Sequence, residues 1–135
     1  MRICGINWIA ALVAAIAIYA VGFLIYGVLI DPKTWMDAAG ITPQQMQAVG
    51  MSRMPFSPIM PLMTAFGMAF LFKWGGVTGA GNGLKWAGLI ALTSAIPTLL
   101  YGWVYGVGPL HATLVGCAHL LIGHLVAGMT LASWK

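Results

Sequence analysis

The stretch NWIAALVAAIAIYAVGFLIYGVLI, residues 7–30, indicates the fold because it has no charged side chain over a length that can cross a bilayer. A helix needs about 20 apolar residues to span the hydrocarbon core. The stretch is also longer than the roughly 7–15 apolar residues of a cleavable signal core. A single basic residue, Arg2, precedes it. We therefore expect an uncleaved first membrane span.

The composition of the whole chain is that of a membrane protein. Of its 135 residues, 61% are hydrophobic and only 6% are charged, whereas roughly a quarter of an ordinary soluble domain is charged. The lipid bilayer is thus the expected main partner. The net charge of +4 comes from scattered Lys and Arg residues, which form no patch for phosphates, so nucleic acid is not expected. Cys4 and Cys117 predict neither a disulfide framework nor a paired metal-binding motif.

Further hydrophobic runs predict three more spans. With the first, the four expected spans are Asn7–Ile30, Phe56–Phe72, Leu84–Gly106 and Leu110–Ala132. The second run opens with PFSPIMP, whose prolines suit a helix start better than a helix interior. We therefore expect residues 1–135 to form a single domain, an all-α integral membrane protein built as a four-transmembrane-helix bundle.

The first loop, residues 31–55, is the one sizeable extramembrane segment in this arrangement. It contains two helix starts. Asp31 precedes Pro32, and Thr42 is followed by Pro43 and by Gln45, three residues after the cap. The loop therefore predicts two short interfacial helices that lie along the membrane surface.

The distribution of basic residues predicts the orientation of the chain. Arg2, Lys73, Lys85 and Lys135 fall on one side of the four spans, and Lys33 and Arg53 fall on the other. The side with more Lys and Arg faces the cytoplasm. We therefore expect both termini to be cytoplasmic.

The third and fourth spans each carry a stripe of small and polar residues at helical spacing. The stripes are Ala87, Ala91, Ser94, Thr98, Tyr101 and Tyr105 in the third span, and Ala112, Gly116, His119, Gly123, Ala127 and Thr130 in the fourth. Small residues let helix backbones approach closely, so we expect the stripes to face each other. The antiparallel register then places His119 near Thr98 and Tyr101. It places His124 near Ser94 and Thr93.

His119 and His124 are the candidate cofactor ligands of the chain. Polar side chains inside a bilayer usually hydrogen-bond across helices, contributing about 0.6–2 kcal/mol each, and this is the interpretation that we favour. The alternatives are a haem or pigment ligand, and a metal or proton-transfer role. The two rings lie about 140° apart around the helix, and no carboxylate lies within a span. We therefore expect no metal site and no bound cofactor.

Three other patterns allow further alternatives. Two Met-x-x-Met pairs, MSRM at 51–54 and MPLM at 60–63, are soft ligands of the kind that binds copper(I), but methionine also simply fills cores. Pro97 predicts a kink, with Thr93 or Ser94 satisfying the freed carbonyl. A small transporter would use such a kink together with the two histidines. The loop GGVTGAGNG, residues 75–83, lacks the phosphate-loop spacing and is interpreted as a turn.

The stretch NWIAALVAAIAIYAVGFLIYGVLIDPKTWM resembles the opening of a family of small bacterial four-span membrane proteins that are catalogued only as a domain of unknown function. The matching positions are Asn7, Ala10, Ala14, Gly22, Tyr26, Trp35 and Met36, followed near the end of the chain by Gly128 and Trp134. Ile25 departs from the pattern, which leads us to expect a Trp there. The resemblance implies the four-span fold and a bacterial inner membrane, and it implies no activity.

An enzyme is not favoured, because the two acids lie in one loop and no serine has a His-carboxylate relay beside it in sequence. We interpret the chain as a small structural or accessory membrane protein, self-associating or packed within a larger membrane complex, for which a bioenergetic complex is one candidate. The alternatives are a haem- or pigment-binding membrane subunit that uses His119 or His124, and a small transporter or copper-handling protein.

Overall fold

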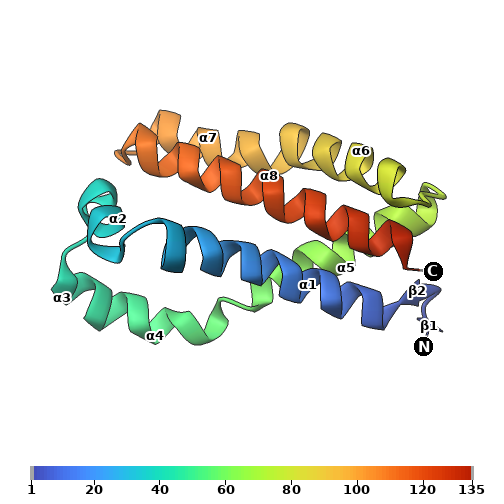
Figure 1. Ribbon diagram of the computed structural model, residues 1–135. Coiled ribbons are helices and arrows are strands. Elements are labelled where there is room, and N and C mark those ends of the chain that lie inside the picture. Colours follow the sequence, from blue (N-terminus) through green and yellow to red (C-terminus); the bar gives the residue numbers. More distant parts are fainter. Residues whose placement is uncertain (1, 135) are drawn as a thin grey trace.

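The computed structural model describes residues 2–134, and within them four long helices are apolar enough to cross a membrane (Figure 1). They cover Trp8–Leu29, Pro43–Trp74, Ala80–Tyr105 and Leu110–Ser133. The predicted all-α membrane bundle is therefore confirmed. The second helix begins well before the expected residue 56, because the helix that starts at Pro43 runs on toward the second span.

Most of the long helices change their hydrogen-bond pattern along their length. The first consists of α1 (Trp8–Phe23) and the π-helical η1 (Leu24–Leu29), and the third of α6 (Ala80–Ile90), the π-helical η4 (Ala91–Ala95) and α7 (Ile96–Tyr105). The second consists of α3 (Pro43–Gln45), the π-helical η2 (Met46–Gly50), α4 (Met51–Arg53), the 3₁₀ turn η3 (Met54–Phe56) and α5 (Ile59–Trp74). The fourth is the single helix α8 (Leu110–Ser133).

A short hairpin precedes the first span. Its strands β1 (Arg2–Ile3) and β2 (Ile6–Asn7) pair antiparallel, with Arg2 opposite Asn7. The turn places Cys4 and Gly5 at positive φ. Asn7 then caps α1, because its side-chain oxygen accepts hydrogen bonds from the backbone N–H groups of Ile9 and Ala10.

Both helix starts predicted in the first loop are confirmed. The Asp31 side chain accepts the backbone N–H of Thr34 at 2.9 Å and caps α2 (Pro32–Ala39). Thr42 and Gln45 form the predicted capping box at α3. The second of these helices is not a separate short piece, however, since it continues through η2 and α4 to the proline-rich turn that leads into α5 (Figure 1).

Pro97 is accommodated by a wide turn directly before it. The backbone N–H of Ile96 bonds to the Ala91 carbonyl, five residues back, at the end of η4. The hydroxyl pattern differs from the expected one. Thr93 donates to the Leu89 carbonyl at 2.7 Å, whereas the Ser94 carbonyl accepts the hydroxyl of Thr98 at 2.8 Å. Hydroxyls on both sides of the wide turn thus satisfy backbone carbonyls of this helix.

In Figure 1, α8 lies between α1 on one side and the helix formed by α6 and α7 on the other, and α5 passes behind α1. The core is built chiefly from small buried residues and a few larger ones: Ala14, Ala15, Ile18, Ala65, Met68, Phe72, Ala87, Ala127 and Ala132. The two chain ends lie at the same end of the bundle (Figure 1). Lys135, used above for the orientation, lies outside the described residues.

Candidate functional site

His119, on α8, packs against α1. Its Nε2 atom lies 3.0 Å from the point where a Cβ on Gly22 would stand, so the ring occupies the space that this glycine leaves open. The ring also meets Tyr26 edge to face, with centroids 5.4 Å apart and planes at 90°. The Ile18 carbonyl faces the same ring. These neighbours belong to the first span, whereas the expected neighbours of His119, Thr98 and Tyr101, belong to the third.

His124 is buried, with 6% of its surface exposed. Its Nδ1 atom lies 2.7 Å from the carbonyl oxygen of Leu120, four residues back in α8. Because a carbonyl only accepts, Nδ1 carries the proton and donates it. We expected His124 to lie near the hydroxyls of Ser94 and Thr93. Its Nδ1 instead donates to the backbone of its own helix. A buried histidine in a helix can satisfy a ring nitrogen with its own backbone.

The two predicted stripes do not face each other along their whole length. Gly116 approaches the side chain of Leu99, and Gly123 approaches Ile18 of α1, so both glycines pack against neighbouring helices. In the third span Ala87 and Ala91 are buried. Its polar half points outward, however, with Ser94, Thr98, Tyr101 and Tyr105 all exposed. The stripe of the third span therefore divides into a buried part in α6 and η4 and an exposed part that is mainly in α7.

A close contact between α6 and α8 pairs Gly83 and Ala87 with Gly128, and this pairing was not predicted from the sequence. A Cβ on Gly128 would collide with Ala87 and with the Gly83 backbone, and a Cβ on Gly83 would collide with the Gly128 backbone. Gly83 and Ala87, like Gly128 and Ala132, are small residues four apart in the chain. That small-xxx-small spacing is a known signal for close helix contacts, and it could have identified this pair.

The largest of the cavities described here lies beside His119, with a volume of about 450 Å³. Its walls come from α1 and η1, from η3 and the turn after it, from the start of α5, and from α8. The lining residues are Ile18, Tyr19, Gly22, Phe23, Tyr26, Gly27, Met54, Ser57, Met60, Pro61 and His119. The fold thus brings one methionine from each Met-x-x-Met pair to the same cavity as an intramembrane histidine. We call this space the His119 cavity.

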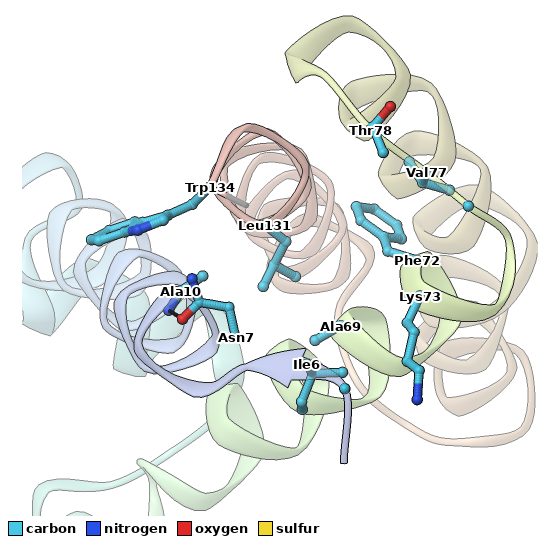
Figure 2. A pocket seen from close by; sticks show the side chains of 12 residues that line it. Ile6, Asn7, Ala10, Ala69, Phe72, Lys73, Val77, Thr78, Leu131 and Trp134 are labelled. Carbon is cyan, nitrogen blue, oxygen red and sulfur yellow. Dashed lines mark hydrogen bonds between the residues drawn. The ribbon is translucent and has the colours of Figure 1, made fainter. Parts of the chain in front are cut away.

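A second cavity of about 250 Å³ lies near the chain ends (Figure 2). Its polar groups are largely occupied, because Asn7 caps α1 and the Lys73 ammonium donates to the Cys4 carbonyl at 2.8 Å. Figure 2 shows Lys73 extending away from Leu131 and Trp134. The glycine-rich loop beside it forms a turn, with Gly76 and Gly79 at positive φ and the Gly79 N–H bonded to the Ala132 carbonyl. Asn7 and Lys73 are therefore already engaged within the protein.

Among the described residues, no group of three or more His, Cys, Asp or Glu side chains is placed to hold a metal ion. Cys117 is half-buried in α8, and Cys4 is exposed in the hairpin turn. Outside the spans, the hydrogen bond from the Thr34 N–H lowers the pKa of Asp31, and the Thr34 hydroxyl lowers that pKa further. Lys33 and Asp37 form an exposed ion pair at 3.8 Å on α2.

Comparison with known proteins gives a family and no activity. One family model matches residues 9–132, and its description is "Protein of unknown function (DUF1761)". No curated protein and no solved structure matches the chain. The match extends over all four long helices. The family resemblance expected from the opening of the sequence is therefore confirmed.

Proposed function

The chain belongs to the protein family of unknown function DUF1761, and we propose that it is a small accessory membrane protein that associates through its third span. The observation that carries this proposal is the exposed polar and aromatic surface formed by Ser94, Thr98, Tyr101, Gly102 and Tyr105. We call it the third-span face. Of the four long helices, the third has the smallest buried share, 11% against 28% for the first.

The chemistry of the third-span face suits another helix better than lipid tails. Tyr101 and Tyr105 are 64% and 82% exposed, and their rings stack with centroids 6.0 Å apart. Gly102 has no atom within 4 Å of its would-be Cβ, so a partner backbone has room to approach there. In hydrocarbon, helices associate through small residues and interhelical hydrogen bonds. This face offers both.

The partner is either a second copy of the chain or a larger membrane complex, and crosslinking distinguishes the two. Cys4 and Cys117 are first replaced by Ser and Ala, and Gly102→Cys is then introduced and treated with oxidant and crosslinker in native membranes. A product of twice the monomer mass identifies a second copy, and a heavier product identified by mass spectrometry identifies another protein. Leu114→Cys, on an exposed face of α8, is the matched control. Equal crosslinking at 102 and 114, or none at 102, contradicts the proposal.

The proposed location is the bacterial inner membrane with both termini in the cytoplasm. Lys73 and Lys85 support this orientation, since they flank the turn between α5 and α6, and a basic excess marks the cytoplasmic side. Reporter fusions at the C-terminus and within residues 40–50 test it. A periplasmic C-terminus overturns the orientation.

A haem or pigment subunit is the second candidate, because His119 lines a cavity of about 450 Å³. A ligating histidine needs a free ring nitrogen that faces open volume. The Nε2 of His119 is packed at Gly22, and the Nδ1 of His124 is bonded to Leu120. We therefore rank this candidate below the accessory role. A coloured preparation that bleaches on replacement of either histidine would reverse the order.

The lining of the His119 cavity is also relevant to the two remaining alternatives, copper handling and transport. Met54, Met60 and His119 share the His119 cavity, which supports soft-metal binding more than the sequence alone did. That cavity is mostly apolar and large, however, whereas a metal site needs donors that converge on one point. We therefore keep copper handling and transport as lesser alternatives.

A further inference from the structure

Two cavities adjoin along the groove between α1 and α5. The His119 cavity shares Tyr19 and Pro61 with a neighbour of about 260 Å³, whose other lining residues are Leu12, Ala15, Ile16, Pro58 and Leu62. We call this neighbour the tail cavity. Along α1 the tail cavity extends from Leu12 to Tyr19, and the His119 cavity continues as far as Gly27. The two cavities therefore lie next to each other along α1 in the membrane-spanning part of the molecule.

The His119 cavity is the end that suits a ring with a polar group. The rings of Tyr19, Phe23, Tyr26 and His119 line it, together with Met54 and Met60. Aromatic side chains and methionine sulfur both make favourable contacts with a further aromatic ring. The volume is also within the range of small-molecule sites, which are mostly apolar with a few polar groups.

Two tyrosines of this cavity, Tyr19 and Tyr26, differ in their hydrogen bonding. Tyr19 shares a hydrogen bond of 3.1 Å with Ser57, but the hydroxyl of Tyr26 forms no hydrogen bond with another described residue. Tyr26 is half-buried. A hydroxyl removed from water without a partner is costly, so a bound acceptor would satisfy it. A lipid acyl chain would leave this hydroxyl unpaired.

The tail cavity suits hydrocarbon, because Leu12, Ile16 and Leu62 give it an apolar wall. We propose that the joined cavities bind a lipid-soluble ring compound that has a ring carbonyl and a hydrocarbon tail, which is the chemistry of a quinone. The ring lies among Tyr26, Phe23 and His119, with its carbonyl accepting the Tyr26 hydroxyl. The tail passes Tyr19 and runs beside Leu12 and Ile16. This binding is independent of the third-span face and of any partner there.

The test measures binding of a benzoquinone that carries a decyl tail to the full-length protein in nanodiscs. We expect saturable binding, and we expect Tyr26→Phe to raise Kd about 3- to 10-fold, because it removes one hydrogen bond and keeps the ring. Ser133→Ala, which removes an exposed hydroxyl of α8 outside both cavities, is the control and should leave Kd unchanged.

Two further measurements separate a quinone from a simple apolar occupant. Decylbenzene keeps the ring and the tail but lacks the carbonyl, so Tyr26→Phe should not change its affinity. Gly27→Val should weaken quinone binding, because its Cβ would meet the Phe23 ring at 3.3 Å and displace that ring. The proposal is overturned if the quinone does not bind, if Tyr26→Phe leaves its Kd unchanged, or if decylbenzene binds equally tightly and with the same sensitivity to Tyr26→Phe.

Discussion

The helices of this bundle pack in two different ways. The helices α6 and α8 make a close contact, whereas a groove with open space lies between α1 and α5. In the first, Gly83 and Gly128 let the backbones nearly touch. In the second, Pro58 and Pro61 lie at the start of α5, and two cavities remain open there. Glycine brings helices together, whereas the ring of proline and the lack of its N–H interrupt regular helix.

The comparison indicates how a small bundle can be rigid in one part and open in another. Lipid tails are as apolar as leucine, so burial of leucine does not drive helices together in a bilayer. Close backbone contact therefore holds α6 to α8. In the groove between α1 and α5, two cavities beside Pro58 and Pro61 leave space for a ligand. We expect substitutions in the first region to affect stability most.

The largest expected effect is that of Gly128→Leu. A Cβ at this position would collide with Ala87 and with the Gly83 backbone, and backbone cannot move aside as a flexible side chain can. We expect a loss of about 3 kcal/mol or more in the free energy of unfolding, at the upper end for overpacking. Unfolding in mixed detergent micelles measures it. Gly67→Leu, in α5 with open space at its Cβ, is the control. Similar losses in both variants would mean that the α6–α8 contact is not specially tight.

A smaller effect is expected at His119, which joins α8 to α1. His119→Leu removes the edge-to-face contact with Tyr26 and the polar contact near Ile18, at a cost of about 1–2 kcal/mol. His119→Gln keeps a donor and an acceptor and should be milder. The same unfolding assay measures both variants.

Absorption spectra of the purified wild-type protein provide the corresponding check on cofactors. We expect no Soret or pigment band and no stoichiometric metal. If a visible band is present and His119→Gln removes it, His119 is a cofactor ligand and the packing role is secondary.

The smallest expected effect lies outside the helix contacts, at the Asp31 cap of α2. The pKa of Asp31 is lowered by the Thr34 N–H, so the carboxylate stabilises the folded state at pH values above its unfolded pKa. This contribution is lost as the pH falls through the lowered pKa of the folded state. Asp31→Asn keeps a good cap without a charge. The stability difference between wild type and Asp31→Asn should therefore shrink as the pH falls below 4, measured by unfolding at a series of pH values. A difference that does not change with pH would contradict the effect.

Local features were predictable where neighbouring residues decide them. The spans follow from the length of each apolar run, and the caps at Asp31 and Thr42 follow from side chains that reach backbone N–H groups a few residues away. The turn at Gly76 and Gly79 follows from the positive φ that glycine adopts easily. The continuation of the helix from Pro43 was missed, since the prolines at 55 and 58 indicated a new start and the wide turn η2 left no signal in the sequence.

The sequence by itself determined that this chain has four membrane helices, that helices begin after Asp31 and Thr42 in the first loop, and which residues share a face of each helix. Only the tertiary structure decided that His119 meets Gly22 and Tyr26, and that Tyr101 faces outward. Helical periodicity fixes the angles between residues of one helix, but it does not fix the rotation of that helix against its neighbours. In water an apolar face reveals this rotation, whereas in a bilayer apolar residues suit both lipid and protein. The rotation is therefore set by close contacts such as Gly83 with Gly128, which arise only when the helices assemble.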